Sequence, residues 1–66
     1  MVTVVFRISS LIHADGAVIL LRQIGVMARV LPFRSTDLDG QRLEVDIDDA
    51  ELKAALAIIR QIDPDA

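Results

Sequence analysis

The segment 42–64 constrains the fold most, because within it a strand pattern turns into a helix pattern with no loop between them. The run reads RLEVDIDDAELKAALAIIRQIDP. Leu43, Val45 and Ile47 alternate with charged residues, which is the period of a strand with one buried face. From residue 49 onward, apolar residues recur at helical spacing. The predicted buried stripe of this helix is Leu52, Ala55, Leu56, Ile59 and Ile62.

The ends of these two elements carry their own signals. We expect Asp48 to cap the helix, with Glu51 reaching back to the cap amide as in a capping box. Pro64 ends the helix, because it cannot continue the hydrogen-bond ladder. Upstream, Asp39-Gly40 is typical of a tight hairpin before the strand. The sequence therefore predicts a hairpin, a strand and a capped helix in this order.

The first 25 residues repeat the order of strand and then helix. The predicted inward face of the strand is Val2, Val4, Phe6 and Ile8. A helix of about 14 residues is predicted over 10–24, with a serine cap at its start and Gly25 at its end. Its apolar face is expected to comprise Ala14, Ala17, Val18, Leu20 and Leu21. Asp15-Gly16 falls within one helical period, so we expect it to lie inside the helix despite being a turn dipeptide.

A further strand is predicted over 27–36. Pro32 lies in its middle and lacks an amide donor, which favours an edge position. The order strand, helix, strand, strand, helix predicts an α+β fold, a ferredoxin-like two-layer sandwich whose fourth strand is absent or very short. The outer edge of the first strand would then be bare or covered by something else, and a bare, flat edge invites pairing with another chain.

Length and composition indicate one domain, 1–66, that needs association to supplement a small core. A chain of 66 residues buries only about 60% of its unfolded surface, and this one has no cysteine for a disulfide. We therefore expect a homodimer or higher oligomer. The net charge is −3, without a basic stripe, which argues against nucleic acid and anionic membranes as partners. The absence of a spanning apolar run and of a signal peptide predicts a cytoplasmic protein.

The chain resembles an ACT domain, the small regulatory module of amino-acid metabolism, over nearly its whole length. Three stretches carry the resemblance: TVVFRIS, LLRQIGVMARV and the closing RLEVDIDDAELKAALAIIRQIDPD. The chain is most similar to the small regulatory subunits of acetohydroxyacid (acetolactate) synthase. The resemblance implies an allosteric ACT-like domain with a small amino acid bound at a dimer interface. It also implies a catalytic subunit of an amino-acid biosynthetic enzyme as partner.

In the family that the chain resembles, the loop between the first strand and the first helix binds the ligand, whose carboxylate is held by amides at the helix start. Two placements of this loop stay open. Anchored on Gly16, the loop has His13 at its polar position, and the helix is about one turn shorter than in the family. Anchored on Gly25, it has Ser9 at the polar position and Ile12 where the family has glycine. The predicted ligand-binding residues are Ser9, Ser10, Ile12 and His13.

The residues do not predict an enzyme, a cofactor or a metal site. No nucleophile stands beside a base, and the chain is too short to enclose a substrate pocket. His13 is the only histidine, and Asp15 falls on another side of the helix. The segment 35–46 has the offsets of a calcium loop, but it lacks the closing glutamate and the flanking helices.

The predicted subunit interface lies on one face of the edge strand and comprises Met27, Arg29, Leu31 and Phe33. Two functional hypotheses follow. The first is a small regulatory or interaction domain that dimerises through a sheet edge and binds an amino-acid effector between subunits. The second is a purely structural association module without a ligand, which Ile12 and the missing last strand favour.

Overall fold

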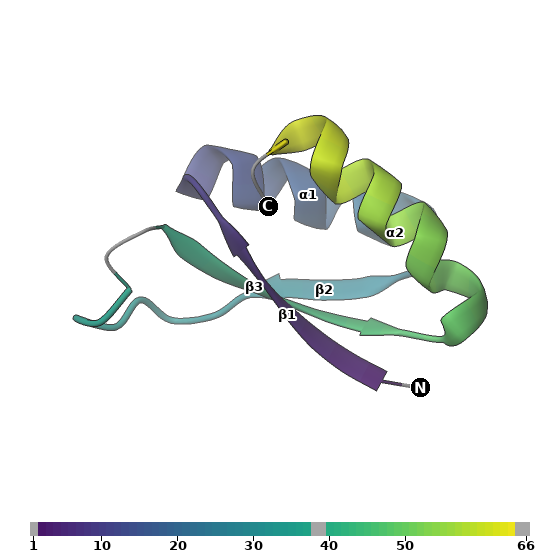
Figure 1. The fold of residues 1–66 in the computed structure, drawn as a ribbon, viewed down its shortest axis with the longest axis horizontal. Helices are drawn as coiled ribbons and strands as arrows, with labels where there is room; N and C mark the ends of the chain where they lie inside the picture. The colour runs from purple at the N-terminus through teal and green to yellow at the C-terminus, as the bar shows by residue number, and fades with distance from the viewer. Residues whose placement is uncertain (1, 38–39, 65–66) are drawn as a thin grey trace.

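Two helices cover one face of a three-stranded antiparallel sheet in the computed structural model, which describes residues 2–37 and 40–64 (Figure 1). The elements are β1 (Val2–Ile8), α1 (Leu11–Gln23), β2 (Met27–Val30), β3 (Gln41–Ile47) and α2 (Asp49–Ile62). The α+β class and the order of the five elements agree with the sequence-based prediction. The strands lie in the order β1-β3-β2, so β1 and β2 form the two edges.

The register of the sheet separates its residues into two faces. Val45 on β3 lies opposite Val4 of β1 and Ala28 of β2. Because opposed residues point to the same face, these three lie in one row under the helices. The alternate rows form the face without helices, here called the open face. Its members are Thr3, Val5, Arg7, Met27, Arg29, Arg42, Glu44 and Asp46.

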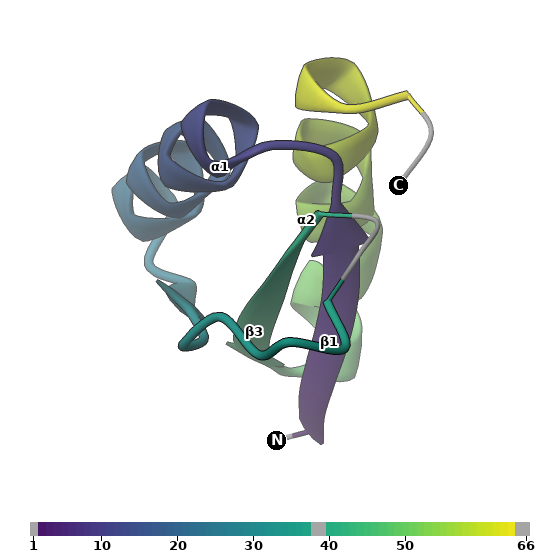
Figure 2. The same cartoon turned by 90° about the vertical axis from the view of Figure 1, so that its left-hand side faces the viewer.

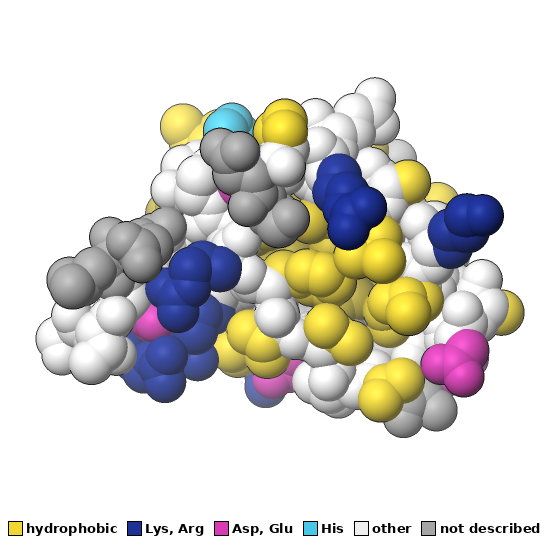
Figure 3. All heavy atoms as spheres, in the orientation of Figure 1, with side chains coloured by type: hydrophobic (Ala, Val, Ile, Leu, Met, Phe, Trp, Pro, Cys, Tyr) yellow, Lys and Arg dark blue, Asp and Glu magenta, His cyan; other side chains and the backbone are white. Residues whose placement is uncertain are grey.

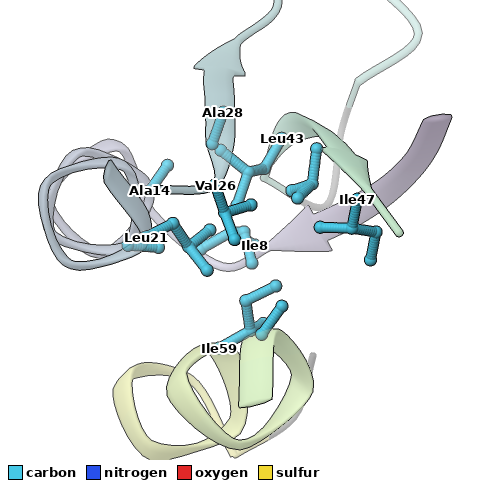
Figure 4. Packing of buried hydrophobic residues seen from close by; sticks show 11 residues of the cluster. Ile8, Ala14, Leu21, Val26, Ala28, Leu43, Ile47 and Ile59 are labelled. Carbon is cyan, nitrogen blue, oxygen red and sulfur yellow. The ribbon is translucent and has the colours of Figure 1, made fainter. Parts of the chain in front are cut away.

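The core lies between the helices and the covered face of the sheet, as Figure 4 shows. Its large, fully buried side chains are Ile8, Leu21, Val26, Leu43, Val45, Ile47 and Ile59. Four alanines fill the remaining positions and allow the helices to approach closely: Ala14, Ala17, Ala28 and Ala55. α1 packs mainly against β2, and α2 lies beside α1 on the side of β1 (Figure 2). α1 therefore lies near the β2 edge of the sheet, and α2 lies near the β1 edge.

α1 has the caps that the sequence predicts. The Ser10 hydroxyl accepts a hydrogen bond from the His13 amide at 3.2 Å. At the other end Gly25 has φ +81°, and the amides of Gly25 and Val26 donate to the carbonyls of Arg22 and Leu21, both at 3.0 Å. This is a Schellman arrangement. Asp15-Gly16 lies inside the helix, as predicted, and no other part of the described chain stands within 4 Å of a Cβ built at Gly16.

The predicted strand over 27–36 is too long. β2 ends at Val30, and the last bond of the ladder runs from the Leu31 amide to the Arg42 carbonyl at 2.9 Å. Pro32 follows directly and has no amide to donate, so pairing stops there. The edge position of β2 agrees with the prediction. The hairpin predicted at Asp39-Gly40 falls partly outside the described residues, since only Gly40, with φ +134°, is described.

Three local predictions are wrong. Leu20 is 40% exposed rather than part of the buried face of α1, and Val2 is 52% exposed at the start of β1. Spacing along an element gives the face on which a residue lies, but the layer packed against that face decides how far the residue is buried. The Asp48 side chain makes no capping hydrogen bond to α2. Instead its carbonyl accepts from the Glu51 amide at 2.9 Å, so the helix starts at the predicted residue through backbone bonding.

Candidate functional site

The predicted ligand loop between β1 and α1 folds around the start of the helix. The hydroxyl of Ser9 lies 3.1 Å from His13 Nδ1, and Ser10 caps the helix. Ile12 projects outward and is 81% exposed. The structure therefore brings Ser9, Ser10 and His13 together and leaves Ile12 apart from them, facing away from the core.

The loop already holds a carboxylate from the chain itself. Asp63, directly after α2, is 4% exposed, and its Oδ2 accepts a hydrogen bond from the Ser9 amide at 2.6 Å. An effector carboxylate would need such loop amides, and here one of them is taken. The contact joins residues 54 positions apart, and no local pattern in the sequence signals it. It ties the end of α2 to the start of α1.

A shallow hollow of about 360 Å³ lies along β2, at the opposite edge of the sheet. Its lining residues are Arg22, Met27, Ala28, Arg29, Glu44 and Asp46. β2 and β3 supply most of this lining, and α1 supplies Arg22 from its last turn. Of the lining residues, Met27 and Arg29 are predicted interface residues, and Asp46 closes the segment with calcium-loop offsets, whereas no site prediction fell on the other three.

The charges around the hollow are partly engaged with one another. Arg29 Nε donates to Glu44 Oε1 at 2.9 Å across the two strands. Asp46 Oδ1 accepts from the Thr3 hydroxyl at 2.6 Å. Two cations and two carboxylates thus surround one hollow.

Arg22 also covers the outer edge of β2. Its Nη2 donates to the Ala28 carbonyl at 3.3 Å. The Leu31 amide bonds to Arg42, so every second residue of this antiparallel ladder points its amide and carbonyl toward β3. Ala28, three positions before Leu31, points its carbonyl to the outside instead. The Arg22 guanidinium is therefore bonded to a carbonyl that a further strand would need as a hydrogen-bond acceptor.

The four predicted interface residues do not form one strand face. Met27 and Arg29 lie on β2 and point to the open face, whereas Leu31 and Phe33 lie beyond the end of the strand. Met27 is 63% exposed and Phe33 is 64% exposed. The predicted interface residues therefore include two exposed apolar side chains, Met27 and Phe33, and a charged one, Arg29, which bonds to Glu44.

A buried carboxylate organises the connection between β2 and β3, and sequence reasoning missed it. Asp37 is 2% exposed and accepts hydrogen bonds from the Arg34 amide at 2.8 Å and the Arg34 Nη2 at 3.0 Å. Arg42 Nε also donates to it at 3.2 Å, and Arg42 Nη2 donates to the Pro32 carbonyl at 2.9 Å. The three-residue spacing from Arg34 to Asp37 was a local signal for this pairing, and Asp37 serves it rather than a calcium loop.

Hydrogen bonds from the Arg34 side chain, followed by its backbone amide and by Arg42, hold the pKa of Asp37 well below its usual range. The same pairing raises the pKa of Arg34. A carboxyl whose pKa is depressed in the folded state adds stability above its unfolded pKa, about 4, and loses that contribution as the pH falls further. The cluster is therefore a structural clamp that acid weakens.

We expect the urea midpoint of the protein to fall as the pH is lowered from 6 to about 3, and to fall less steeply in Asp37→Asn. The amide of the variant does not titrate, so the difference between the two curves isolates this carboxyl. At neutral pH the variant should be the less stable protein, because Arg34 and Arg42 lose their counter-charge. Parallel curves with a constant offset would contradict the assigned pKa direction.

Neither helix in the described part of the chain is long and apolar enough to cross a membrane. Among the same residues, no three histidine, aspartate or glutamate side chains are grouped so that they could hold a metal ion. Comparison with protein-family models, with curated proteins and with solved structures finds no match to this chain.

Proposed function

We propose that this chain is a small association module that joins copies of itself through a sheet edge. One observation carries the proposal, which is that many large apolar side chains lie exposed on a chain with a small core. The core has few large side chains and is completed by four alanines. Nine large hydrophobic residues within the described ranges are at least 40% exposed: Val2, Val5, Leu11, Ile12, Ile19, Leu20, Ile24, Met27 and Phe33. A second copy would cover part of this surface and supplement a marginal core.

The arrangement of the sheet supports the same proposal. The strand order β1-β3-β2 with both helices on one face is compatible with a ferredoxin-like, ACT-like sandwich. In that arrangement a fourth strand would lie beside β1. Within the described residues β1 has a strand on one side only. An edge of this kind is a template for pairing with another chain.

The solution mass tests association. Sedimentation velocity at about 10 to 100 μM, a range that detects micromolar dissociation constants, should give twice the chain mass or a larger multiple. Tm should rise with protein concentration, because a bound partner stabilises the folded state by mass action. A monomer throughout this range, with a Tm independent of concentration, would overturn the proposal.

A second candidate function is the binding of a small amino-acid effector, as the resemblance to ACT domains implies. The specific observation in its favour is the hollow along β2, where Arg22 and Arg29 lie with Glu44 and Asp46. The loop at Ser9 is the other candidate place, but its amide bonds to Asp63. A thermal-shift panel of the common amino acids, each at millimolar concentration, tests this function. No shift in a confirmed dimer would leave the purely structural module.

A further inference from the structure

We propose that the second copy pairs along β1, antiparallel and centred on Val5, so that two three-stranded sheets form one continuous sheet. This inference rests on the proposed function, and it states which edge is used and in which register. It differs from the interface predicted on the β2 side from the sequence. Four observations lead to it: the open edge of β1, the covered edge of β2, the match of apolar rows and the match of charges.

The edge of β1 is long, and no described strand pairs with it. β1 runs over Val2–Ile8, seven residues, and pairs only with β3 among the described strands. It contains no proline and no lysine, and Arg7 is its only charged residue. Protected edges are usually short, charged, bulged or covered. β1 has little of this protection, so its outward backbone groups are available to another strand.

The edge of β2 is protected in several ways. β2 has four residues, and Pro32 follows close behind its end. The outward carbonyl of Ala28 accepts a hydrogen bond from Arg22. A strand that added here would have to displace the guanidinium and would gain few ladder bonds. Of the two edges, β1 is therefore the one suited to pairing.

A register centred on Val5 keeps both helical layers on the same side of the joined sheet. In this register Thr3 lies opposite Arg7 of the second copy, and Val5 lies opposite its own equivalent. The two residues of each pair point to the same face of the joined sheet. On the covered face, Val4 meets Phe6 of the second copy. Both are partly buried against the core in one copy and would extend its apolar rows. Figure 3 shows hydrophobic side chains gathered on this side of the molecule, where β1 and α2 face the viewer.

The charges on the open face favour the same register. In one copy Arg7 lies opposite Arg42, a like-charged neighbour, and forms no ion pair with any described residue. In the joined sheet, Arg7 of the second copy lies opposite Thr3, whose other neighbour is Asp46. Asp46 is then two strand spacings away, about 10 Å between Cα atoms, and a long arginine side chain can extend over the short Thr3 toward it. A two-fold axis forms this contact twice.

A pair of matched lysine variants distinguishes the two edges. Val5 and Met27 are 52% and 63% exposed on the open face, one on each edge strand. Val5→Lys places two ammonium groups opposite each other at the two-fold axis, so we expect the dissociation constant of the dimer to rise at least about tenfold. Met27→Lys should leave it within about threefold. Circular dichroism of both variants at low concentration shows whether the fold is kept.

Cross-linking tests the register and does not depend on a destabilising change. The chain has no cysteine, so a single Val5→Cys variant should form a covalent dimer rapidly with a short bifunctional thiol reagent. Thr3→Cys alone and Arg7→Cys alone should cross-link slowly, and a mixture of the two should cross-link rapidly. Met27→Cys is the control on the other edge and should remain monomeric on a denaturing gel.

The outcomes separate this inference from the proposed function. A wild-type monomer at about 100 μM overturns both, because each requires association. A wild-type dimer in which Met27→Lys dissociates the subunits, Val5→Lys does not, and Val5→Cys fails to cross-link overturns the β1 pairing alone. Rapid cross-linking of Thr3→Cys or Arg7→Cys by itself overturns the register.

Discussion

Replacing Ile59 with alanine is expected to lower the free energy of unfolding by about 3 kcal/mol. Ile59 is 1% exposed on the inner side of α2, where it packs into the core beneath the helices. Alanine would leave a cavity that the surrounding side chains can close only in part. Because a domain of this size has little stability to lose, much of the variant should be unfolded at room temperature. Urea unfolding followed by far-UV circular dichroism measures the change.

Ile12→Ala is the matched control, because it makes the same change on the other helix. Ile12 is 81% exposed, and alanine has the higher helix propensity, so we expect a change within about 0.5 kcal/mol. Both variants must be compared at one protein concentration, since association contributes to the apparent stability. Equal losses at the two positions would contradict the placement of Ile59 in the core and of Ile12 on the surface.

Gly40→Ala is expected to destabilise the protein by at least about 2 kcal/mol. Gly40 has φ +134°, a conformation that L side chains rarely adopt, just before β3 begins. A Cβ at this position would overlap the carbonyl oxygen of Ile8 and stand 3.1 Å from the Ser9 Cα. Both neighbours are backbone, so relief requires the end of β1 to move away from β3. The shift in the urea midpoint measures the cost.

Gly16→Ala should have the opposite sign and stabilise the protein by roughly 1 kcal/mol. Gly16 lies inside α1, and apart from the adjacent backbone of its own helix a Cβ there meets nothing within 4 Å in the described chain. Alanine is the best helix former and restricts the unfolded chain. A destabilising Gly16→Ala would show that another chain packs against this position in solution. The two substitutions together separate a glycine required by the backbone from one that the fold does not need.

Most of the secondary structure could be predicted because its signals are local. The alternation around Val45 and the helical spacing around Ala55 lie within single elements. The serine cap at Ser10 and the left-handed Gly25 lie at their ends. The prediction failed where a neighbouring layer decides burial, as at Leu20. It also failed where a strand ends for lack of a partner, as after Val30.

The candidate sites were less predictable, because their contacts join distant residues. Ser9 and His13 were singled out and lie together, but Asp63 reaches the same loop from the far end of the chain. Arg22 lies in the last turn of α1, and the helical pattern does not predict its bond to the Ala28 carbonyl. The clamp at Asp37 combines a local partner, Arg34, with Arg42 on β3. Of these two contacts, only the pair Arg34–Asp37 has a short sequence spacing that could have been recognised in advance.

The sequence by itself determined the α+β class, the order of the five elements, and the continuation of α1 through Asp15-Gly16. It could do so because periodicity and capping act over a few neighbouring residues. The tertiary structure alone decided that Asp63 closes the β1–α1 loop, that Arg22 covers the edge of β2, and that the longer edge of β1 has no partner strand among the described residues. These outcomes depend on how the layers bring remote side chains to a loop or an edge, and no local pattern records that placement.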